Sequence, residues 1–285
     1  MTEISAEKVK ELREKSGAGF MDCKRALSAT QGDLDAATDL LRKEGVVKAA
    51  KKAGRATSEG LIALETGTEG SAILEVNCET DFVARTDQFQ EFINSVANLI
   101  VQKKPENLET LLTQSFGTST LQQSLSELIA RIGENIVLKR FRRVEAVSGK
   151  EQVGSYVHAG SKIGVILKVK LAGGSLEDSL LRDIAMHVAA MNPPYIRRED
   201  VPSSVVEREK EILRAQPELA SKPANMIDKI LEGKINRFYS DTCLNEQLFI
   251  KDPTGKKSVG AFLKEVSPGT ELVEVIRFQV GEEVS

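Results

Sequence analysis

The sequence predicts an α+β protein, because stretches with the two-residue apolar repeat of strands alternate with stretches that have the spacing of amphipathic helices. The same order of two strands and one helix occurs twice, at 60–65, 72–76 and 89–101 and again at 152–158, 164–171 and 176–191. A further helix is expected at 121–132 and a further strand at 135–147. We therefore expect two repeated α+β subdomains, each with a small antiparallel sheet packed against helices.

Length and composition indicate a folded protein of about two domains with an appendage. The chain has 285 residues, of which 41% are hydrophobic and 28% charged, enough for a sizeable core. Its net charge of −3 argues against a general binder of nucleic acid or of membrane surfaces. Aromatic residues make up 5% and Trp is absent, so side chains on which bases could stack are scarce. We expect neither direct nucleic-acid binding nor membrane binding.

The cysteines and histidines indicate neither a metal site nor a disulfide framework. Cys23, Cys78 and Cys243 are widely spaced, and the chain has two histidines, so a structural zinc site is improbable. Free thiols suit a reducing compartment. The N-terminal sequence shows no apolar signal segment, and no apolar run reaches the ~18 residues of a membrane span. We expect a soluble, cytoplasmic protein without a metal or cofactor.

Residues 1–55 are expected to form a three-helix domain and a linker. Ser5 can cap a first helix that ends at Gly17, a second helix covers 21–31, and a third starts after Asp33 and ends at Gly45. Three short helices in so few residues resemble the ubiquitin-associated fold.

Two features of this region leave alternatives open. The turn 17–21 places Phe20 and Met21 near the surface, where they either plug the small core or form a recognition patch. Residues 46–58, rich in Lys, Ala and Gly, form either a nucleic-acid arm or a solvated helix end and linker. The weak positive charge of 46–58 favours the linker.

The core is expected to comprise a first subdomain at 56–148 and a second at 149–285. Residues of about 193–241 break the repeat with two highly charged helices that carry a narrow apolar stripe. This pattern predicts an inserted antiparallel coiled-coil hairpin. The C-terminal module, about 251–285, is expected to hold a helix at 257–264 and a strand at 271–280, after a strand-like stretch at 247–250.

The stretch 77–85, Asn-Cys-Glu-Thr-Asp-Phe-Val-Ala-Arg, lies at a strand-to-helix turn. Loops at such positions often carry function. Phe82, flanked by acidic residues, is either tucked under the next helix or offered to a partner. His187, which aligns with Leu99 of the first repeat, is either a hydrogen-bonded structural residue or a ligand.

Catalysis has little support in the sequence. The chain shows no glycine-rich phosphate loop, no Gly-x-Ser-x-Gly turn and no His-Glu-x-x-His helix. An enzyme would need Cys78, Asp81 and His187 as nucleophile and partners, and no spacing supports that set. We expect no bond-making chemistry.

Four motifs, taken together and in order, carry a family resemblance that covers the whole chain. They are the stretches 17–24, 77–85, 132–136 and 184–190. The sequence closely resembles the elongation factor Ts family, guanine-nucleotide exchange factors for elongation factor Tu, in its long form. It departs from the family pattern slightly, with Phe20 where Met is frequent and Arg25 where Lys is common.

The resemblance implies roles for ten residues. The turn Thr80, Asp81, Phe82 and Val83 would enter the GTPase domain of elongation factor Tu, nucleotide-free or GDP-bound, and Phe82 would disturb the Mg²⁺ site and promote GDP release. Ile132, Gly133 and His187 would line the same contact region. Arg13, Phe20 and Met21 would dock on another face of that domain.

Two rival interpretations account for less of the chain. An RNA-binding translation protein conflicts with the low net charge. A ubiquitin-type adaptor explains the first 55 residues and leaves the repeat and the hairpin unexplained.

Overall fold

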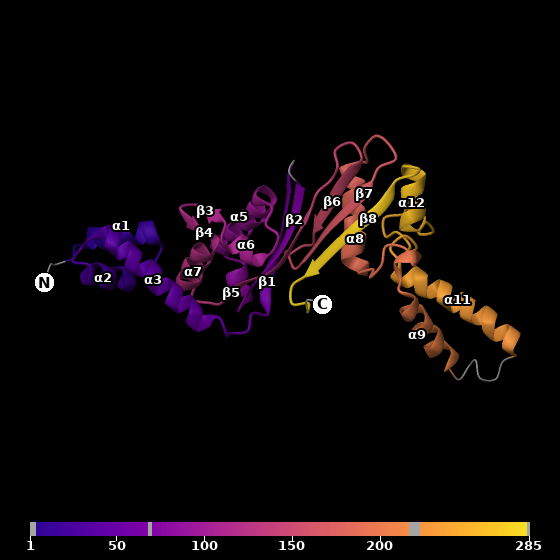
Figure 1. Ribbon diagram of the computed structural model, residues 1–285, viewed down its shortest axis with the longest axis horizontal. Helices are drawn as coiled ribbons and strands as arrows, with labels where there is room; N and C mark the ends of the chain where they lie inside the picture. The colour runs from indigo at the N-terminus through magenta and orange to yellow at the C-terminus, as the bar shows by residue number, and fades with distance from the viewer. Residues whose placement is uncertain (1–3, 68–69, 217–222, 284–285) are drawn as a thin grey trace. The chain divides into compact units, whose positions relative to one another are not determined.

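The chain folds into two compact units, as the computed structural model shows for residues 4–67, 70–216 and 223–283. Unit 1 comprises Met1–Arg143 and Gln279–Ser285, and unit 2 comprises Val144–Phe278 (Figure 1). Unit 2 is thus inserted into the chain of unit 1. The predicted subdomain boundaries place 279–285 with the second subdomain, whereas the structure groups these residues with the first unit. Each unit is described by itself below.

Unit 1 begins with three helices, α1 (Ala6–Ser16), α2 (Phe20–Ala29) and α3 (Leu34–Lys52). Two of the predicted caps are present. Ser5 Oγ accepts from the Lys8 amide at 3.3 Å, and Asp33 Oδ1 accepts from two amides at the start of α3. Gly17 ends α1 in the left-handed conformation, with φ of 64°. A small cluster around Leu12 and Leu27 forms the core of the three helices.

The predicted end of the third helix at Gly45 is wrong, because α3 continues to Lys52. Gly45 is buried where α3 packs against α7 (Leu121–Ile132). A Cβ atom on Gly45 would lie 3.6 Å from the Ala130 Cβ, an ordinary packing distance, so the two helices are in contact at this point. Of the two interpretations of 46–58, the structure shows the helix end and linker: residues up to Lys52 are the end of α3, and the residues after it lead to β1.

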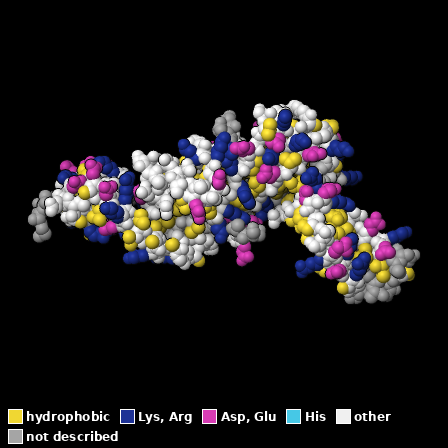
Figure 2. Space-filling view, in the orientation of Figure 1, with side chains coloured by type: hydrophobic (Ala, Val, Ile, Leu, Met, Phe, Trp, Pro, Cys, Tyr) yellow, Lys and Arg dark blue, Asp and Glu magenta, His cyan; other side chains and the backbone are white. Residues whose placement is uncertain are grey.

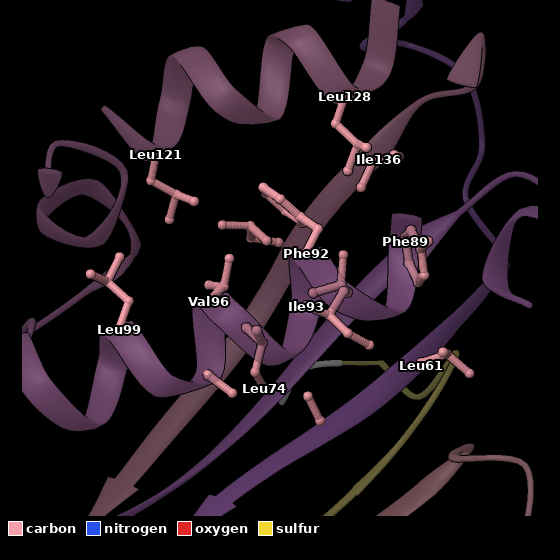
Figure 3. Packing of buried hydrophobic residues seen from close by; sticks show 14 of the residues in the cluster. Leu61, Leu74, Phe89, Phe92, Ile93, Val96, Leu99, Leu121, Leu128 and Ile136 are labelled. Carbon is pink, nitrogen blue, oxygen red and sulfur yellow. The ribbon is translucent and has the colours of Figure 1, made fainter. Parts of the chain in front are cut away.

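The rest of unit 1 is a sheet covered by helices. Strands β1 (Glu59–Gly67), β2 (Gly70–Cys78) and β5 (Ile136–Val144) have the order β1-β2-β5, and β1 pairs antiparallel with β2. Helix α5 (Asp87–Lys103) packs on β1 and β2. Figure 3 shows the apolar side chains of α5, α7 and the strands meeting in one core, including Phe89, Phe92 and Leu74.

Four short elements of unit 1 lie outside the predicted set. They are α4 (Asp81–Ala84), α6 (Leu108–Leu112), β3 (Ser115–Phe116) and β4 (Ser119–Thr120). Each has at most five residues, too few for an apolar repeat to reveal it. Of these, α4 matters most, since it contains Phe82.

Unit 2 contains the second strand–strand–helix repeat. Strands β6 (Glu151–Val157), β7 (Ile163–Lys170) and β8 (Glu271–Gln279) form a sheet in this order, with β6 antiparallel to β7, and α8 (Asp178–Met191) packs on β6 and β7. The prediction of an α+β fold with small antiparallel sheets is therefore confirmed. Helix α12 (Val259–Val266) precedes β8.

The expected strand at 247–250 is absent from the described part of unit 2. Leu248 makes one isolated bridge to Ser258, and the Gln247 side chain is engaged with α8 and with the end of α11. The strand-like pattern comes from the consecutive apolar residues Leu248, Phe249 and Ile250, which here lie in a loop with Phe249 buried and the other two exposed.

The segment between α8 and α12 carries η1 (Arg198–Asp200), α9 (Ser203–Arg214) and α11 (Ala224–Thr242). Helices α9 and α11 lie side by side and share a small apolar cluster that includes Leu213, Leu231 and Ile235 (Figure 1). The turn expected between them falls on 217–222, outside the described residues. Arg198 fastens the base of α11, because its guanidinium binds Glu246 and lies 4.6 Å from the centre of the Tyr239 ring. Within the described ranges, no helix is both long and apolar enough to cross a bilayer.

A buried ionic cluster joins the two chain segments of unit 1. The Glu75 side chain is fully buried on β2 and accepts from Arg140 Nε at 2.6 Å. Arg140 also donates to the Gln279 carbonyl and lies 3.4 Å from Glu282, while the Gly281 amide donates to Glu75 at 3.2 Å. The residues that follow β8 are thus held against the first sheet by a charge that lies out of contact with water.

Arg140→Met should destabilise unit 1 by about 3 kcal/mol, because it leaves the Glu75 carboxylate buried without its cation. Urea unfolding would measure the loss. Arg142→Met, at an exposed position of the same strand, is the matched control and should cost less than about 0.5 kcal/mol. Adding Glu75→Gln to Arg140→Met should recover part of the loss. If the double variant is no more stable than Arg140→Met, the isolated charge is not the cause.

Candidate partner-binding site

The chain turns sharply after β2, and Thr80 is the residue that fixes the turn. Its Oγ1 accepts from the Val83 amide at 3.4 Å and so caps α4. Its carbonyl oxygen accepts from the Ala84 amide at 3.4 Å and from Cys78 Sγ at 3.2 Å. The backbone that leads into α4 is therefore hydrogen-bonded both to the end of α4 at Ala84 and to Cys78, the last residue of β2.

Helix α4 has one face in the core and one in water. Val83 and Ala84 are buried among the apolar residues of unit 1, whereas Phe82 is 79% exposed. Of the two positions open for Phe82, the structure shows the exposed one. Val83, expected to belong to the partner-binding turn, points its side chain into the core and anchors the turn instead. Asp81 lies beside Phe82 and pairs with Arg85 at 2.9 Å.

The end of α7 holds this turn from the other side. Gly133 ends α7 with φ of 92°, and the chain then turns so that Glu134 reaches Thr80. Glu134 Oε2 accepts from the Thr80 amide at 3.0 Å, and Oε1 accepts from the Thr80 hydroxyl at 2.6 Å. The Asn135 amide donates to Glu79 Oε1 at 2.6 Å. Two adjacent residues thus bind the two residues that precede Asp81.

The three N-terminal helices are fastened to the same helix α7. Arg131 donates to the Ser16 carbonyl at 3.0 Å, and its guanidinium covers Gly17, where any Cβ would lie 2.6 Å from it. Lys52 Nζ donates to the Ile129 carbonyl at 3.4 Å. The Asn135 side chain donates to the Arg55 carbonyl at 3.0 Å, which fixes the chain just after α3.

Phe20 and Met21 stand in the first turn of α2 and are 48% and 71% exposed. They do not plug the small core, which is filled by other residues such as Leu12 and Leu27. Arg13, on α1, is also exposed. These side chains could therefore contact a partner without any rearrangement.

Unit 1 thus brings most of the expected site residues onto one connected framework. Glu134 joins the turn Thr80–Val83 to the end of α7 at Ile132 and Gly133, and Arg131 joins α7 to the loop between α1 and α2. Glu134 and Asn135 stand in the 132–136 motif, yet the sequence alone assigns them no role. Their signal is an acidic residue and an amide directly after a helix-ending glycine.

His187 lies in unit 2 and is fully buried on α8. Its Nδ1 accepts from the Ile250 amide at 3.4 Å, so Nε2 carries the proton and donates to Gln247 Oε1 at 2.9 Å. The Gln247 amide is oriented by donating to the Asp241 carbonyl. Burial lowers the pKa of His187, and the hydrogen bond to Gln247 opposes this shift in part. The imidazole is thus neutral and holds the loop that exposes Leu248 and Ile250.

Stability should fall as the pH is lowered from 7 towards 5, and His187 should cause the fall. Because the pKa of His187 is lowered in the folded state, the unfolded chain binds this proton first. The contribution of His187 to the free energy of unfolding is complete above a pH of about 6.5, the ordinary histidine pKa. It is lost as the pH falls through the folded-state pKa. Urea unfolding at several pH values would measure it. His158→Gln, at the exposed second histidine, should keep the fall, whereas His187→Gln should remove it. An equal fall in both variants would contradict this assignment.

Metal ligands do not gather in the described residues, where no group of three His, Cys, Asp or Glu side chains could hold an ion. The exposed features of the site are an aromatic ring, an acidic neighbour and a separate apolar pair on α2. Such surfaces suit contact with another protein.

Comparisons with known proteins identify the family of the chain. The family model described as Elongation factor TS matches residues 79–282, which include α4, the end of α7 and all of unit 2. A protein named Elongation factor Ts from Trichlorobacter lovleyi is 43% identical over 291 residues, covering 98% of this chain and 93% of its own length. The chain therefore belongs to the elongation factor Ts family, the nucleotide exchange factors for elongation factor Tu in translation elongation.

Proposed function

We propose that this chain promotes GDP release by inserting the turn Thr80–Val83 into the GTPase domain of elongation factor Tu, in its GDP-bound or nucleotide-free form. Phe82 displaces side chains near the Mg²⁺ site, and the arrangement of Mg²⁺ and phosphates is disturbed. One observation carries this proposal. The large apolar side chain of Phe82 is 79% exposed, and the turn that carries it is held by hydrogen bonds from Thr80 to Cys78 and to Glu134.

The physical advantage of Phe82 is that little freedom is lost when it binds. Its side chain has two torsions, and its backbone is already held by the Thr80 cap and by Val83 in the core. A flexible loop would lose part of its binding free energy in ordering itself. Most of the binding free energy from contacts of Phe82 is therefore available to disturb the nucleotide site.

The required energy is modest. A nucleotide in a GTPase pocket is held largely by phosphate hydrogen bonds and by a bridging Mg²⁺. Removing contacts worth ~4 kcal/mol would speed release about a thousandfold, at ~1.4 kcal/mol per factor of ten. No bond is made or broken, so neither a catalytic group nor a cofactor of this chain takes part.

The remaining contact residues provide the affinity that keeps the turn in place. Arg13, Phe20 and Met21 dock on a second face of the GTPase domain, which their exposure permits. Ile132 and Gly133 line the contact beside the turn.

His187 contributes to the contact indirectly. Its ring is buried, so it acts by holding the loop that presents Leu248 and Ile250. Ile250 receives this support through its amide, which donates to the imidazole.

The other parts of the chain serve the same protein contact. The three N-terminal helices form a ubiquitin-associated-like domain, and α9 and α11 form an antiparallel coiled-coil hairpin. The chain works in the cytoplasm and binds neither nucleic acid directly nor membranes. Figure 2 shows Lys and Arg interspersed with Asp and Glu over the visible face, which supports a protein partner over a polyanion.

Adding the protein to elongation factor Tu loaded with labelled GDP should speed release, and Phe82→Ala should reduce the acceleration about tenfold to a hundredfold. That range corresponds to ~1.4–2.8 kcal/mol, the order of loss expected for an aromatic residue at the centre of a contact. The substitution should leave the fold intact because the ring lies in water. Val147→Ala, also exposed and remote from the turn in sequence, is the control and should behave as wild type. Wild-type release rates with Phe82→Ala would refute the proposed role.

Mg²⁺ should weaken the complex of wild-type protein with elongation factor Tu and GDP more than it weakens the Phe82→Ala complex. Phe82 and the Mg²⁺–nucleotide group need the same volume, so each reduces the affinity of the other by the same factor. Titration of both variants, with Mg²⁺ and with a chelator, would give the four affinities. Equal Mg²⁺ effects on the two variants would show that Phe82 does not oppose the metal.

A further inference from the structure

We propose that Glu134 is a positioning residue for nucleotide exchange: its carboxylate binds both hydrogen-bond donors of Thr80 and so fixes the direction in which α4 presents Phe82. This inference rests on the proposed function and adds a residue that need not touch the partner. It starts from one contact, in which the two oxygens of a single carboxylate accept from the amide and the hydroxyl of the same residue.

The Thr80 hydroxyl has one hydrogen, and that hydrogen points to Glu134 Oε1 at 2.6 Å. Its lone pairs are therefore left to accept from the Val83 amide, which makes Thr80 the cap of α4. A carboxylate can only accept, so it imposes this direction. Glu134 thus holds the Thr80 hydroxyl in the orientation in which it caps α4.

Helix α4 depends on such support because it has four residues, fewer than an isolated helix needs to persist in water. Two supports hold it in the structure: the cap at Thr80 and the burial of Val83 and Ala84. Burial of Val83 and Ala84 keeps α4 against the core, and the cap at Thr80 sets the direction in which the axis of α4 leaves β2. Phe82 lies two residues beyond the cap, so a change of that angle moves its ring directly.

Glu134 also relates the turn to the surface that carries Phe20 and Met21. It follows α7, which binds the loop between α1 and α2 through Arg131 and contacts α3 along its length. The same short stretch therefore fixes Phe82 and supports the helices that carry the second docking face. Exchange requires both surfaces to meet the GTPase domain at once, so their spacing within unit 1 must be set before binding.

Glu134→Gln is the sharpest test because it keeps the shape and removes one acceptor. The new amide oxygen can accept from the Thr80 amide, but the amide nitrogen then faces the Thr80 hydroxyl as a donor, so the hydroxyl hydrogen loses its acceptor and the negative charge that strengthens both bonds is gone. Hydrogen bonds to a charged group are strong enough that we expect about a tenfold loss in the maximal rate of GDP release. The concentration for half-maximal release should change less than about threefold, since the surfaces on α1 and α2 remain. Thr80→Val, which removes the hydroxyl from the same contact, should also lower the maximal rate.

Matched controls separate positioning from a loss of folded protein. Glu91→Gln, on the exposed face of α5, should release GDP at the wild-type rate. Amide hydrogen exchange in Glu134→Gln should speed up at Thr80 and Val83 and stay unchanged at Phe92 and Ile93 in the core. General unfolding would instead speed exchange in both regions and would overturn the inference.

The decisive measurement combines Glu134→Gln with Phe82→Ala in full-length protein. If Glu134 acts through Phe82, the substitution should change the maximal rate less than about twofold once the ring is absent. A tenfold loss in that background, or a wild-type maximal rate in Glu134→Gln alone, would overturn the inference while the proposed function stands. If Phe82→Ala alone releases GDP as wild type does, the proposed function fails and the inference fails with it.

Discussion

A large aromatic ring can stand in water on a helix of four residues only if the backbone beneath it is held by other parts of the protein. Here the restraint comes from one carboxylate at the end of α7, which accepts two hydrogen bonds from Thr80, and from the two apolar residues that follow Phe82 into the core. Hydrogen bonds to an ionised acceptor are stronger than those between neutral groups. Here they hold Thr80, the residue that caps α4. The rigidity of the exposed turn is thus a property of the core of unit 1.

How much of this could be read from the sequence depended on how far apart the interacting residues stand. The caps at Ser5 and Asp33 involve neighbours within three positions, and both were predictable. Gly45 misled because glycine usually ends helices, whereas here α3 continues past it and packs against the distant helix α7. The contact between Thr80 and Glu134 spans 54 positions, so the acidic residue after the helix-ending glycine does not by itself indicate its partner.

The expected site residues prove to be of two physical kinds. Phe20, Met21 and Phe82 are exposed and could touch a partner as they stand, whereas His187 and Val83 are buried. A resemblance assigns residues to a contact without saying which of them touch the partner and which are buried and hold the contacting residues in place. The structure adds that distinction for His187, which is buried and whose two ring nitrogens both bond to the 247–250 loop of unit 2.

The insertion of unit 2 into unit 1 sets the order in which a newly made chain can be completed. Glu75 and Arg140 are synthesised early, but Gln279 and Glu282 follow only after all of unit 2. At a synthesis rate of 5–20 residues per second, the delay is on the order of ten seconds. During that interval β2 lacks the Gly281 amide that binds Glu75, and the ionic cluster is incomplete. The first unit to leave the ribosome is therefore the last to be completed, because the partners of Glu75 and Arg140 from its second segment arrive only after unit 2.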